Sequence, residues 1–138
     1  MNYAATIYNG TDTNLFSFNP NPKDYLLYLG ELVERKGVRE AILAAKKTKS
    51  KLVIAGRIPL QTSQIKDHSF FQKYVKPELN RDQIEYAGEV SSEKTPGFYG
   101  NAKITLFPIR WEEPFGLVMT ESMSCGTPII AFARGSVP

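Results

Sequence analysis

Residues 104–132 read ITLFPIRWEEPFGLVMTESMSCGTPIIAF and contain the clearest structural pattern in the chain. The stretch opens and closes with short apolar runs that are typical of buried strands. Pro114 and Gly116 indicate a loop after the first run. The residues from Leu117 to Cys125 have helical composition, and Gly126-Thr127-Pro128 ends that helix. The pattern therefore predicts a strand, a loop, a helix and a second strand, in that order.

Two acidic residues, Glu113 in the loop and Glu121 early in the helix, are the functional candidates of this stretch. The amides of Gly116, Leu117 and Val118 would be free donors at the helix start, where the helix dipole is positive. Such a helix start attracts phosphate. Because helical side chains lean toward the N-terminus, Glu121 is expected to point back at the same loop, within reach of ligand hydroxyls beside the phosphate.

Three further segments, residues 25–30, 51–56 and 83–88, are predicted as strands and each end in glycine, and the first of them is a nearly continuous apolar run. Nearly continuous apolar runs of this length are typical of strands buried on both faces of a parallel sheet. Strands that alternate with helices at this spacing predict an α/β fold with a doubly wound, mostly parallel, Rossmann-like sheet. The order of the strands, Rossmann-like or flavodoxin-like, is left open.

The helices between these strands are indicated with different clarity. One helix is predicted from apolar residues at i, i+3, i+4 and i+7, which are Val38, Ala41, Ile42 and Ala45. A second is expected to end at Pro77, and the residues on its apolar face are Ile65, Phe71, Tyr74 and Val75. Pro96-Gly97 is expected to bend or shorten a third helix.

Lys36 lies in a polar loop, residues 31–37, between the first strand and its helix. In doubly wound sheets, ligands bind beyond the carboxyl ends of the strands. A lysine at this helix entrance is placed to pair with a diphosphate oxygen, although a lysine on a loop is more often simply solvated. Residues 88–94 and 113–121 also follow strand ends. We therefore expect one site at this edge of the sheet.

The sequences Glu-Pro-Phe-Gly-Leu at 113–117 and Glu-Ser-Met-Ser-Cys-Gly-Thr-Pro-Ile-Ile-Ala at 121–131 resemble the E-x7-E motif of retaining nucleotide-sugar glycosyltransferases with the GT-B architecture, specifically glycosyltransferase family 4 (glycosyl transferases group 1). Lys36 matches the lysine of the family's Gly-Arg-Leu-x-x-x-Lys-Gly pattern. The lead-in to the family's donor domain, Asn-Gly-x-Asp-x-x-x-Phe, is matched by Asn9, Gly10, Asp12 and Phe16. The alternative is that both glutamates merely complement a helix dipole.

The resemblance implies that the chain is the C-terminal half of a GT-B fold, truncated at its end. Residues 1–23 would be an inter-domain lead-in, and residues 24–138 an incomplete nucleotide-sugar-binding domain. The implied reaction moves a hexose from a UDP-, GDP- or ADP-sugar to an acceptor. The implied partner is an N-terminal acceptor-binding domain outside this chain, so this part alone is expected to be inactive.

The resemblance also implies roles for individual residues. Lys36 and the amides of residues 116–118 would hold the diphosphate, and Glu121 would accept hydrogen bonds from the ribose hydroxyls. Glu113, as the catalytic residue, would hold the sugar hydroxyls and orient the anomeric carbon, with Phe115 lining the sugar subsite beside the glycine that follows it. This layout implies no metal and no cofactor, and the chain has no Asp-x-Asp pair to bind a metal.

Glu31 departs from the family pattern, which has arginine after the strand glycine. A carboxylate cannot make the bidentate guanidinium contact with phosphate, and it would repel a diphosphate. Either Glu31 turns outward and a cation such as Arg35, Arg57 or Arg110 replaces the arginine, or donor binding is weakened. Glu31 is therefore counted among the residues that decide donor binding.

Other functions stay open to different degrees. Glu31 and the absence of an acceptor domain favour a nucleotide-binding or assembly module without catalysis as the second function. A sugar phosphorylase would need a pyridoxal-phosphate lysine that lies outside this sequence. A dinucleotide oxidoreductase is disfavoured because no Gly-x-Gly-x-x-Gly follows the first strand. Residues 88–94 would surround the nucleobase, but Ser91-Ser92-Glu93 equally fits an ordinary helix cap.

Composition narrows the class of protein. With 138 residues, 42% of them hydrophobic, we expect one soluble globular domain without a transmembrane segment or signal peptide. The net charge of +3 fits an anionic small ligand or peripheral contact with an anionic membrane, while scattered Lys and Arg argue against nucleic acid. The single cysteine, Cys125, suits a cytoplasmic location and is expected in the core, and His68 is expected at the surface. Apolar surface left open after the fifth strand predicts self-association.

Overall fold

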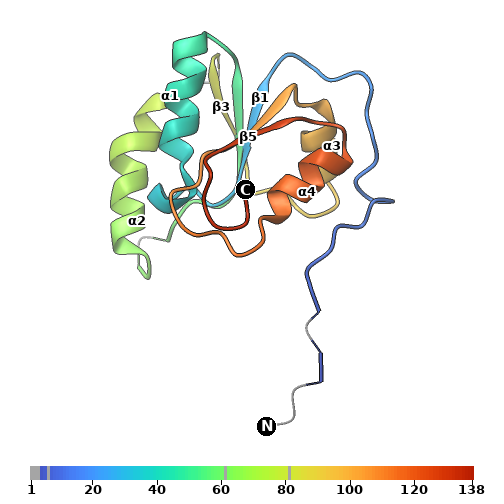
Figure 1. Ribbon diagram of the computed structural model, residues 1–138. Helices are drawn as coiled ribbons and strands as arrows, with labels where there is room; N and C mark the ends of the chain where they lie inside the picture. Colours follow the sequence, from blue (N-terminus) through green and yellow to red (C-terminus); the bar gives the residue numbers. More distant parts are fainter. Residues whose placement is uncertain (1–3, 6, 61, 81) are drawn as a thin grey trace.

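The computed structural model describes residues 4, 5, 7–60, 62–80 and 82–138 (Figure 1). The strands are β1 (Leu26–Leu29), β2 (Leu52–Ala55), β3 (Ile84–Gly88), β4 (Ile104–Phe107) and β5 (Ile129–Ala131). They form one parallel sheet in the order β3-β2-β1-β4-β5. This is the Rossmann order, so the predicted α/β fold class is confirmed and the strand order that the sequence left open is established.

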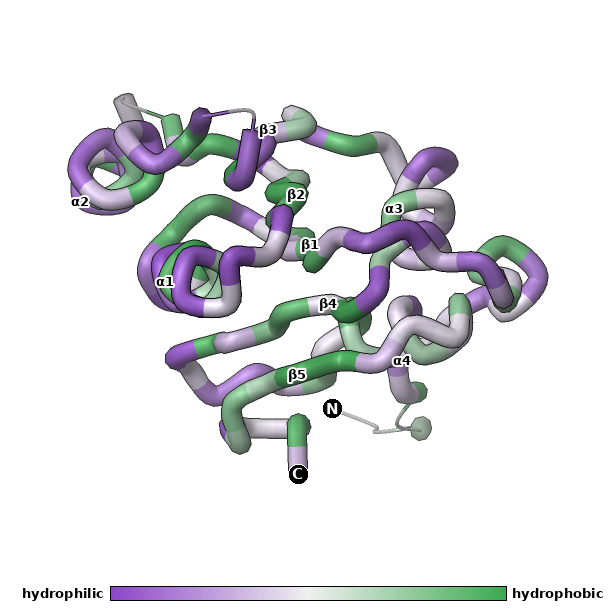
Figure 2. Tube along the Cα trace, turned by 90° about the horizontal axis from the view of Figure 1, so that it is seen from above, coloured by the Kyte–Doolittle hydropathy of each residue, from purple (hydrophilic) through white to green (hydrophobic). Residues whose placement is uncertain are grey.

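The helices cover both faces of the sheet, with α1 and α2 on one side and α3 and α4 on the other (Figure 2). Their bounds are Val38–Thr48 for α1, Ile65–Phe70 for α2, Thr95–Asn101 for α3 and Leu117–Ser124 for α4. Central strands β1 and β2 are almost entirely buried because both of their faces are covered. Edge strands β3 and β5 are only partly buried.

Two hydrophobic cores result from this arrangement. The first packs α1 against the sheet, and the four residues predicted for its apolar face are all buried. The second packs α3 and α4 against Leu27 and includes Phe16 from the segment before β1. Phe16 meets the ring of Tyr99 at a centroid distance of 6.1 Å. The predicted lead-in segment therefore contributes to the core, although its described residues form no helix or strand.

One expectation about the helices is wrong. Ile65 does not face the core, because α2 continues into a π-helical turn, Phe71–Val75, whose wider turn shifts the buried face. Ile65 remains 68% exposed. The expectation that the third helix is bent or shortened is confirmed in its second form, because α3 has 7 residues. Pro96 lies in its first turn, where the missing N–H of proline has no helical partner. No described helix combines the length and the apolar character needed to cross a membrane.

A hydrophobic face of β4 and β5 lies open beside α1. A cavity of about 110 Å³ in this face has mostly apolar walls. It shares Ala44, Leu106 and Ile130 with a cavity of about 640 Å³, whose walls also include charged residues such as Lys51 and Lys103. Ile130 is 58% exposed and Phe132 is 49% exposed. Exposed apolar surface of this kind is typical of sites that associate with protein.

We expect the chain to self-associate through this face. The substitution Ile130→Glu places a charge in the apolar surface and should shift the protein toward monomer in light scattering. Ile65→Glu, at an exposed apolar residue on α2, is the matched control and should leave the association state unchanged. A monodisperse wild-type monomer would refute the expectation.

Candidate functional site

A cavity of about 230 Å³ lies at the carboxyl ends of β1 and β4, where the strand order reverses. Ligands of doubly wound sheets bind at this switch point. Six predicted site residues line it together with Asn9, Phe107 and Pro114, namely Lys36, Glu113, Phe115, Gly116, Leu117 and Val118. A smaller cavity of about 50 Å³ continues toward Gly30 and shares Lys36 and Val118. The cavity of about 640 Å³ lies at the amino ends of β1 and β4, away from all of these residues.

Lys36 is the last residue of a 3-10 turn, Glu34–Lys36, and Gly37 joins this turn to α1. Gly37 has φ of +77°, and a Cβ placed on it would lie 1.8 Å from the carbonyl oxygen of Pro108. The loop after β1 can therefore contact the loop after β4 only through glycine. The amide of Arg110 donates to the carbonyl of Arg35 at 2.8 Å and completes this contact.

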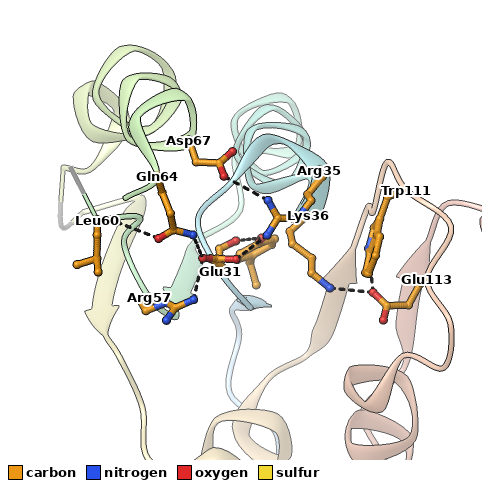
Figure 3. A network of polar contacts seen from close by, with 10 residues as sticks. Glu31, Arg35, Lys36, Arg57, Leu60, Gln64, Asp67, Trp111 and Glu113 are labelled. Carbon is orange, nitrogen blue, oxygen red and sulfur yellow. Dashed lines mark hydrogen bonds and ion pairs between the residues drawn. The ribbon is translucent and has the colours of Figure 1, made fainter. Parts of the chain in front are cut away.

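This loop contact brings Lys36 and Glu113 together. The Lys36 Nζ lies 2.8 Å from the Glu113 Oε2, although the two residues are 77 positions apart (Figure 3). Glu113 is only 9% exposed, so the ammonium offsets the cost of burying its charge. The sequence predicted that both would lie at one site, and the structure places them in direct contact.

Trp111 is a member of this site that sequence reasoning missed. Its indole Nε1 donates to the Glu113 Oε2 at 3.0 Å, and the Lys36 Nζ lies 4.6 Å from the centroid of its ring. The sequence does place a tryptophan two residues before Glu113. Because a partly buried indole N–H usually finds a hydrogen-bond acceptor, this spacing was a signal for the contact.

The start of α4 forms another wall of the cavity. Gly116 is the N-cap, with φ of +78°. Within the described residues, the amides of Gly116, Leu117 and Val118 donate to no protein acceptor, whereas the Met119 amide bonds the Gly116 carbonyl at 2.8 Å. These amides remain available to an anion, as the sequence pattern predicted.

The segment after β5 supports the loop that carries Glu113. The Ser136 amide donates to the Glu113 carbonyl at 2.8 Å, and the Gly135 amide donates to Glu112 Oε2 at 2.7 Å. Gly135 has φ of +56°, and a Cβ on it would lie 2.3 Å from the Glu113 carbonyl oxygen. No pattern in the sequence predicted this second support.

Glu121 is not among the residues that line the cavity. Its carboxylate accepts a hydrogen bond from the Tyr99 hydroxyl at 3.0 Å, so it faces α3. Burial raises the pKa of Glu121, and the hydrogen bond from Tyr99 opposes this only in part. Burial and the nearby Glu121 raise the pKa of Tyr99 far above its ordinary range, so the phenol stays a donor.

The raised pKa of Glu121 has a consequence for stability. A carboxyl group whose pKa is higher in the folded chain favours folding below its unfolded pKa, and this contribution is lost as pH rises through the folded value. Glu121→Gln keeps an acceptor for Tyr99 but cannot ionise. We expect the variant to melt at a higher temperature than wild type at neutral pH, with the difference shrinking in acid. A variant that melts lower at neutral pH would contradict this.

Glu31 lies beside the cavity rather than in its wall, within a network of polar contacts (Figure 3). Its Oε1 accepts from Arg57 and Gln64 at 2.9 Å each, and its Oε2 accepts from Arg35 at 2.9 Å. Burial acts to raise the pKa of Glu31, but the hydrogen bonds of Gln64 and Arg57 and the charge of Arg35 outweigh it and lower the pKa. Arg110 pairs instead with Glu34 and Glu40.

The remaining candidates have structural roles. Cys125 is fully buried, as predicted, and burial raises the pKa of its thiol. His68 is half-buried rather than at the surface, because its Nδ1 lies 2.9 Å from the Pro59 carbonyl oxygen. In the part of the chain that the structure describes, no group of three His, Cys, Asp or Glu side chains is placed to hold a metal.

Comparisons with known proteins agree with this geometry. The sequence profile of the family "Glycosyl transferases group 1" matches residues 12–138. An uncharacterized glycosyltransferase of Methanocaldococcus jannaschii is 29% identical over 136 residues, which are 99% of this chain and 36% of that protein. The O-antigen chain mannosyltransferase B of Escherichia coli is 29% identical over 83% of this chain and 30% of its own length. The chain thus spans about a third of the length of these relatives.

A solved structure is similar over nearly the whole chain. The C-terminal domain of a glycosyl transferase group 1 family protein from Francisella tularensis superimposes with a TM-score of 0.70 and 25% identity, over 94% of this chain and 73% of that one. The predicted α/β, Rossmann-like fold class is the fold of this C-terminal domain. The sequence match, the strand order and the site at the switch point together assign the chain to the glycosyl transferases group 1 family.

Proposed function

We propose that the chain is the nucleotide-sugar-binding domain of a retaining glycosyltransferase, which moves a hexose from an NDP-sugar to an acceptor. The observation that carries this proposal is the contact between Lys36 and Glu113 beside the start of α4. One cation, a set of free amides and one carboxylate meet in a single cavity. Diphosphate and sugar hydroxyls are the complementary chemistry for these groups.

Lys36 and the start of α4 would bind the diphosphate. The ammonium and the amides of residues 116–118 approach the cavity from two different elements. When the bond to the sugar breaks, negative charge accumulates on the departing diphosphate, and donors already in place stabilise it most in that state. This supplies the role that a metal ion plays in other transferases.

Glu113 would bind the sugar. Its Oε2 is held by Lys36 and Trp111, and the carboxylate lies in the cavity wall beside Phe115. A carboxylate accepts hydrogen bonds from neighbouring hydroxyls, which fixes the ring and directs the anomeric carbon toward an acceptor. The acceptor itself would be supplied by an N-terminal domain outside this chain.

Glu121 would accept from the ribose hydroxyls. Among the described residues, its carboxylate accepts from a single donor, the Tyr99 hydroxyl. A carboxylate has about four acceptor positions, so this bond leaves capacity for two hydroxyls. Its place on α4, eight residues after Glu113, supports a separate subsite for the nucleoside.

Arg57 and Arg35 would replace the arginine that the family pattern has at position 31. Both guanidinium groups are held by Glu31, one on each carboxylate oxygen. Because Glu31 is paired in this way, its own charge is largely neutralised. We infer that Glu31 orients the two cations rather than repelling the donor.

The substitution Glu31→Gln tests this role. Removing the charge releases both arginines from their shared anchor, so we expect affinity for a nucleoside diphosphate to fall about threefold, in keeping with partly exposed ion pairs. Isothermal titration calorimetry measures the change. Tighter binding in the variant would show that Glu31 acts by repulsion.

The proposed function itself is tested by calorimetric titration of the chain with UDP, GDP and ADP. Saturable binding of one nucleotide, lost in Glu121→Ala, would support a working nucleoside and diphosphate site and identify the base. Binding of none of them would contradict the proposal. A nucleotide-binding module without catalysis, which the glutamate at position 31 favours, would bind nucleotide but not discriminate between a nucleotide and its sugar conjugate.

A further inference from the structure

The proposed function gives Trp111 no role beyond its hydrogen bond to Glu113, yet Trp111 touches both of that function's central residues, Glu113 and Lys36. It is the only tryptophan in the sequence, and it lies in the loop between β4 and α4. It is 37% exposed, so the core does not require it.

The indole makes two different contacts. Its N–H donates to Glu113 Oε2, the same oxygen that accepts from Lys36, and its ring face lies under the Lys36 ammonium (Figure 3). The three groups form a closed triangle. A neutral donor and an aromatic face are the two interactions that a tryptophan can offer to a carboxylate and an ammonium at once.

The two carboxylate oxygens of Glu113 differ in their hydrogen bonds. Both described donors bond Oε2, and within the described residues no hydrogen bond reaches Oε1. Among the described residues, the fully buried side-chain oxygen or nitrogen without a hydrogen-bond partner is Glu40 Oε2. Glu113 Oε1 also lacks a partner among these residues but is not fully buried, and Glu113 lines the cavity.

Arrival of a diphosphate would change the triangle. Lys36 would be drawn toward the phosphate oxygens, because two negative charges compete for one ammonium. Glu113, only 9% exposed, would then lose its cation while remaining buried. The indole N–H carries no net charge and already bonds Oε2, so a phosphate attracts it less strongly than the ammonium, and it can continue to hold Oε2.

We propose that Trp111 is the positioning residue of the sugar end of this site. Its N–H fixes Glu113 Oε2 so that Oε1 is presented to a hydroxyl of the donor sugar, and its ring face supports Lys36 on the side of the diphosphate. The inference rests on the proposed function and adds the group that keeps Glu113 oriented after Lys36 is drawn away.

The substitution Trp111→Phe separates these two contacts, because phenylalanine keeps an aromatic face and lacks the N–H. Calorimetry with UDP, GDP and ADP should give affinities within about twofold of wild type. For the nucleotide that binds, the matching UDP-glucose, GDP-mannose or ADP-glucose should bind about tenfold more weakly than it does to wild type, as expected for losing one hydrogen bond to a charged acceptor. Trp111→Ala should weaken both.

Tyr74→Leu is the matched control. Tyr74 also lies under a lysine, with the Lys73 Nζ at 5.0 Å from its ring centroid, but it does not line the cavity. This variant should change neither affinity. If Tyr74→Leu loses as much sugar-nucleotide affinity as Trp111→Phe does, general destabilisation explains the effect and the inference is overturned.

The single indole N–H gives a readout that needs no ligand. Its one cross-peak in a proton–nitrogen correlation spectrum should move in Glu113→Gln, and an unmoved peak would overturn the inference. If a nucleotide binds, but Trp111→Phe binds that nucleotide and its sugar conjugate with wild-type affinities, the inference fails and the proposed function stands. If no nucleotide binds the wild-type chain, the proposed function fails, and the inference fails with it.

Discussion

Under the proposed function, Glu113→Gln in a protein that joins this domain to an acceptor-binding domain is expected to lower sugar transfer by about 100- to 1,000-fold, the range seen when one preorganised group at a reacting centre is removed. The amide cannot accept through both of its terminal atoms, so the donor sugar loses its orientation. It also cannot form an ion pair with Lys36, which now lies 2.8 Å from the carboxylate.

Nucleotide binding should respond differently. Because Lys36 is released from Glu113, affinity of the variant for the nucleoside diphosphate should stay within about twofold of wild type or become tighter. Turnover is measured by release of the diphosphate, and affinity by calorimetry on the same preparation. Equal losses of turnover and diphosphate affinity would show that Glu113 merely holds the site together.

Gly37→Ala is expected to destabilise the chain by about 3 to 5 kcal/mol, which combines a left-handed backbone with an overpacked contact. Gly37 has φ of +77°, and the new Cβ would lie 1.8 Å from the Pro108 carbonyl oxygen. The clash is with backbone, so no side-chain rotation relieves it. The loops after β1 and β4 would have to separate, which would also move Lys36 away from Glu113.

Gly97→Ala is the matched control for this prediction. Gly97 lies in α3, without a positive φ, and a Cβ there meets no atom within 4 Å. Alanine is a better helix former, so the free energy of unfolding should rise or stay the same. Urea denaturation of the two variants measures the contrast. A loss of less than 1 kcal/mol in Gly37→Ala would mean that the loop contact is not rigid.

The sheet and the location of the site could be predicted from the sequence for a physical reason. Buried parallel strands must be apolar on both faces, so the runs around β1, β2 and β4 were visible as strands. Groups that follow the ends of neighbouring parallel strands must converge, which is why Lys36 and Glu113 could be assigned to one site without knowing the strand order.

The contacts that organise the site could not be predicted in this way. Glu31 was judged by its charge, but its effect depends on Arg35 and Arg57, and the latter is 26 residues away. The direction of Glu121 depends on Tyr99, 22 residues earlier on α3. Both depend on how distant elements pack, which leaves no periodic signal in the sequence.

Ile65 failed as a core residue for a more local reason. The apolar spacing from Ile65 to Val75 was interpreted with one period of 3.6 residues, but the chain passes from α2 into a π-helical turn at Phe71. A turn of different width rotates the buried face relative to the first part of the helix. Because this irregular turn depends on packing against α1 and the sheet, a pattern with one fixed period cannot predict it.

The most direct test of the donor site is phosphorus NMR of UDP, GDP or ADP titrated with the chain. The account predicts that one nucleotide shows saturable shifts of both diphosphate resonances, and that Lys36→Met abolishes them while the protein stays folded. Binding that leaves the phosphorus resonances unchanged, or shifts that persist in Lys36→Met, would contradict a diphosphate site between Lys36 and the start of α4.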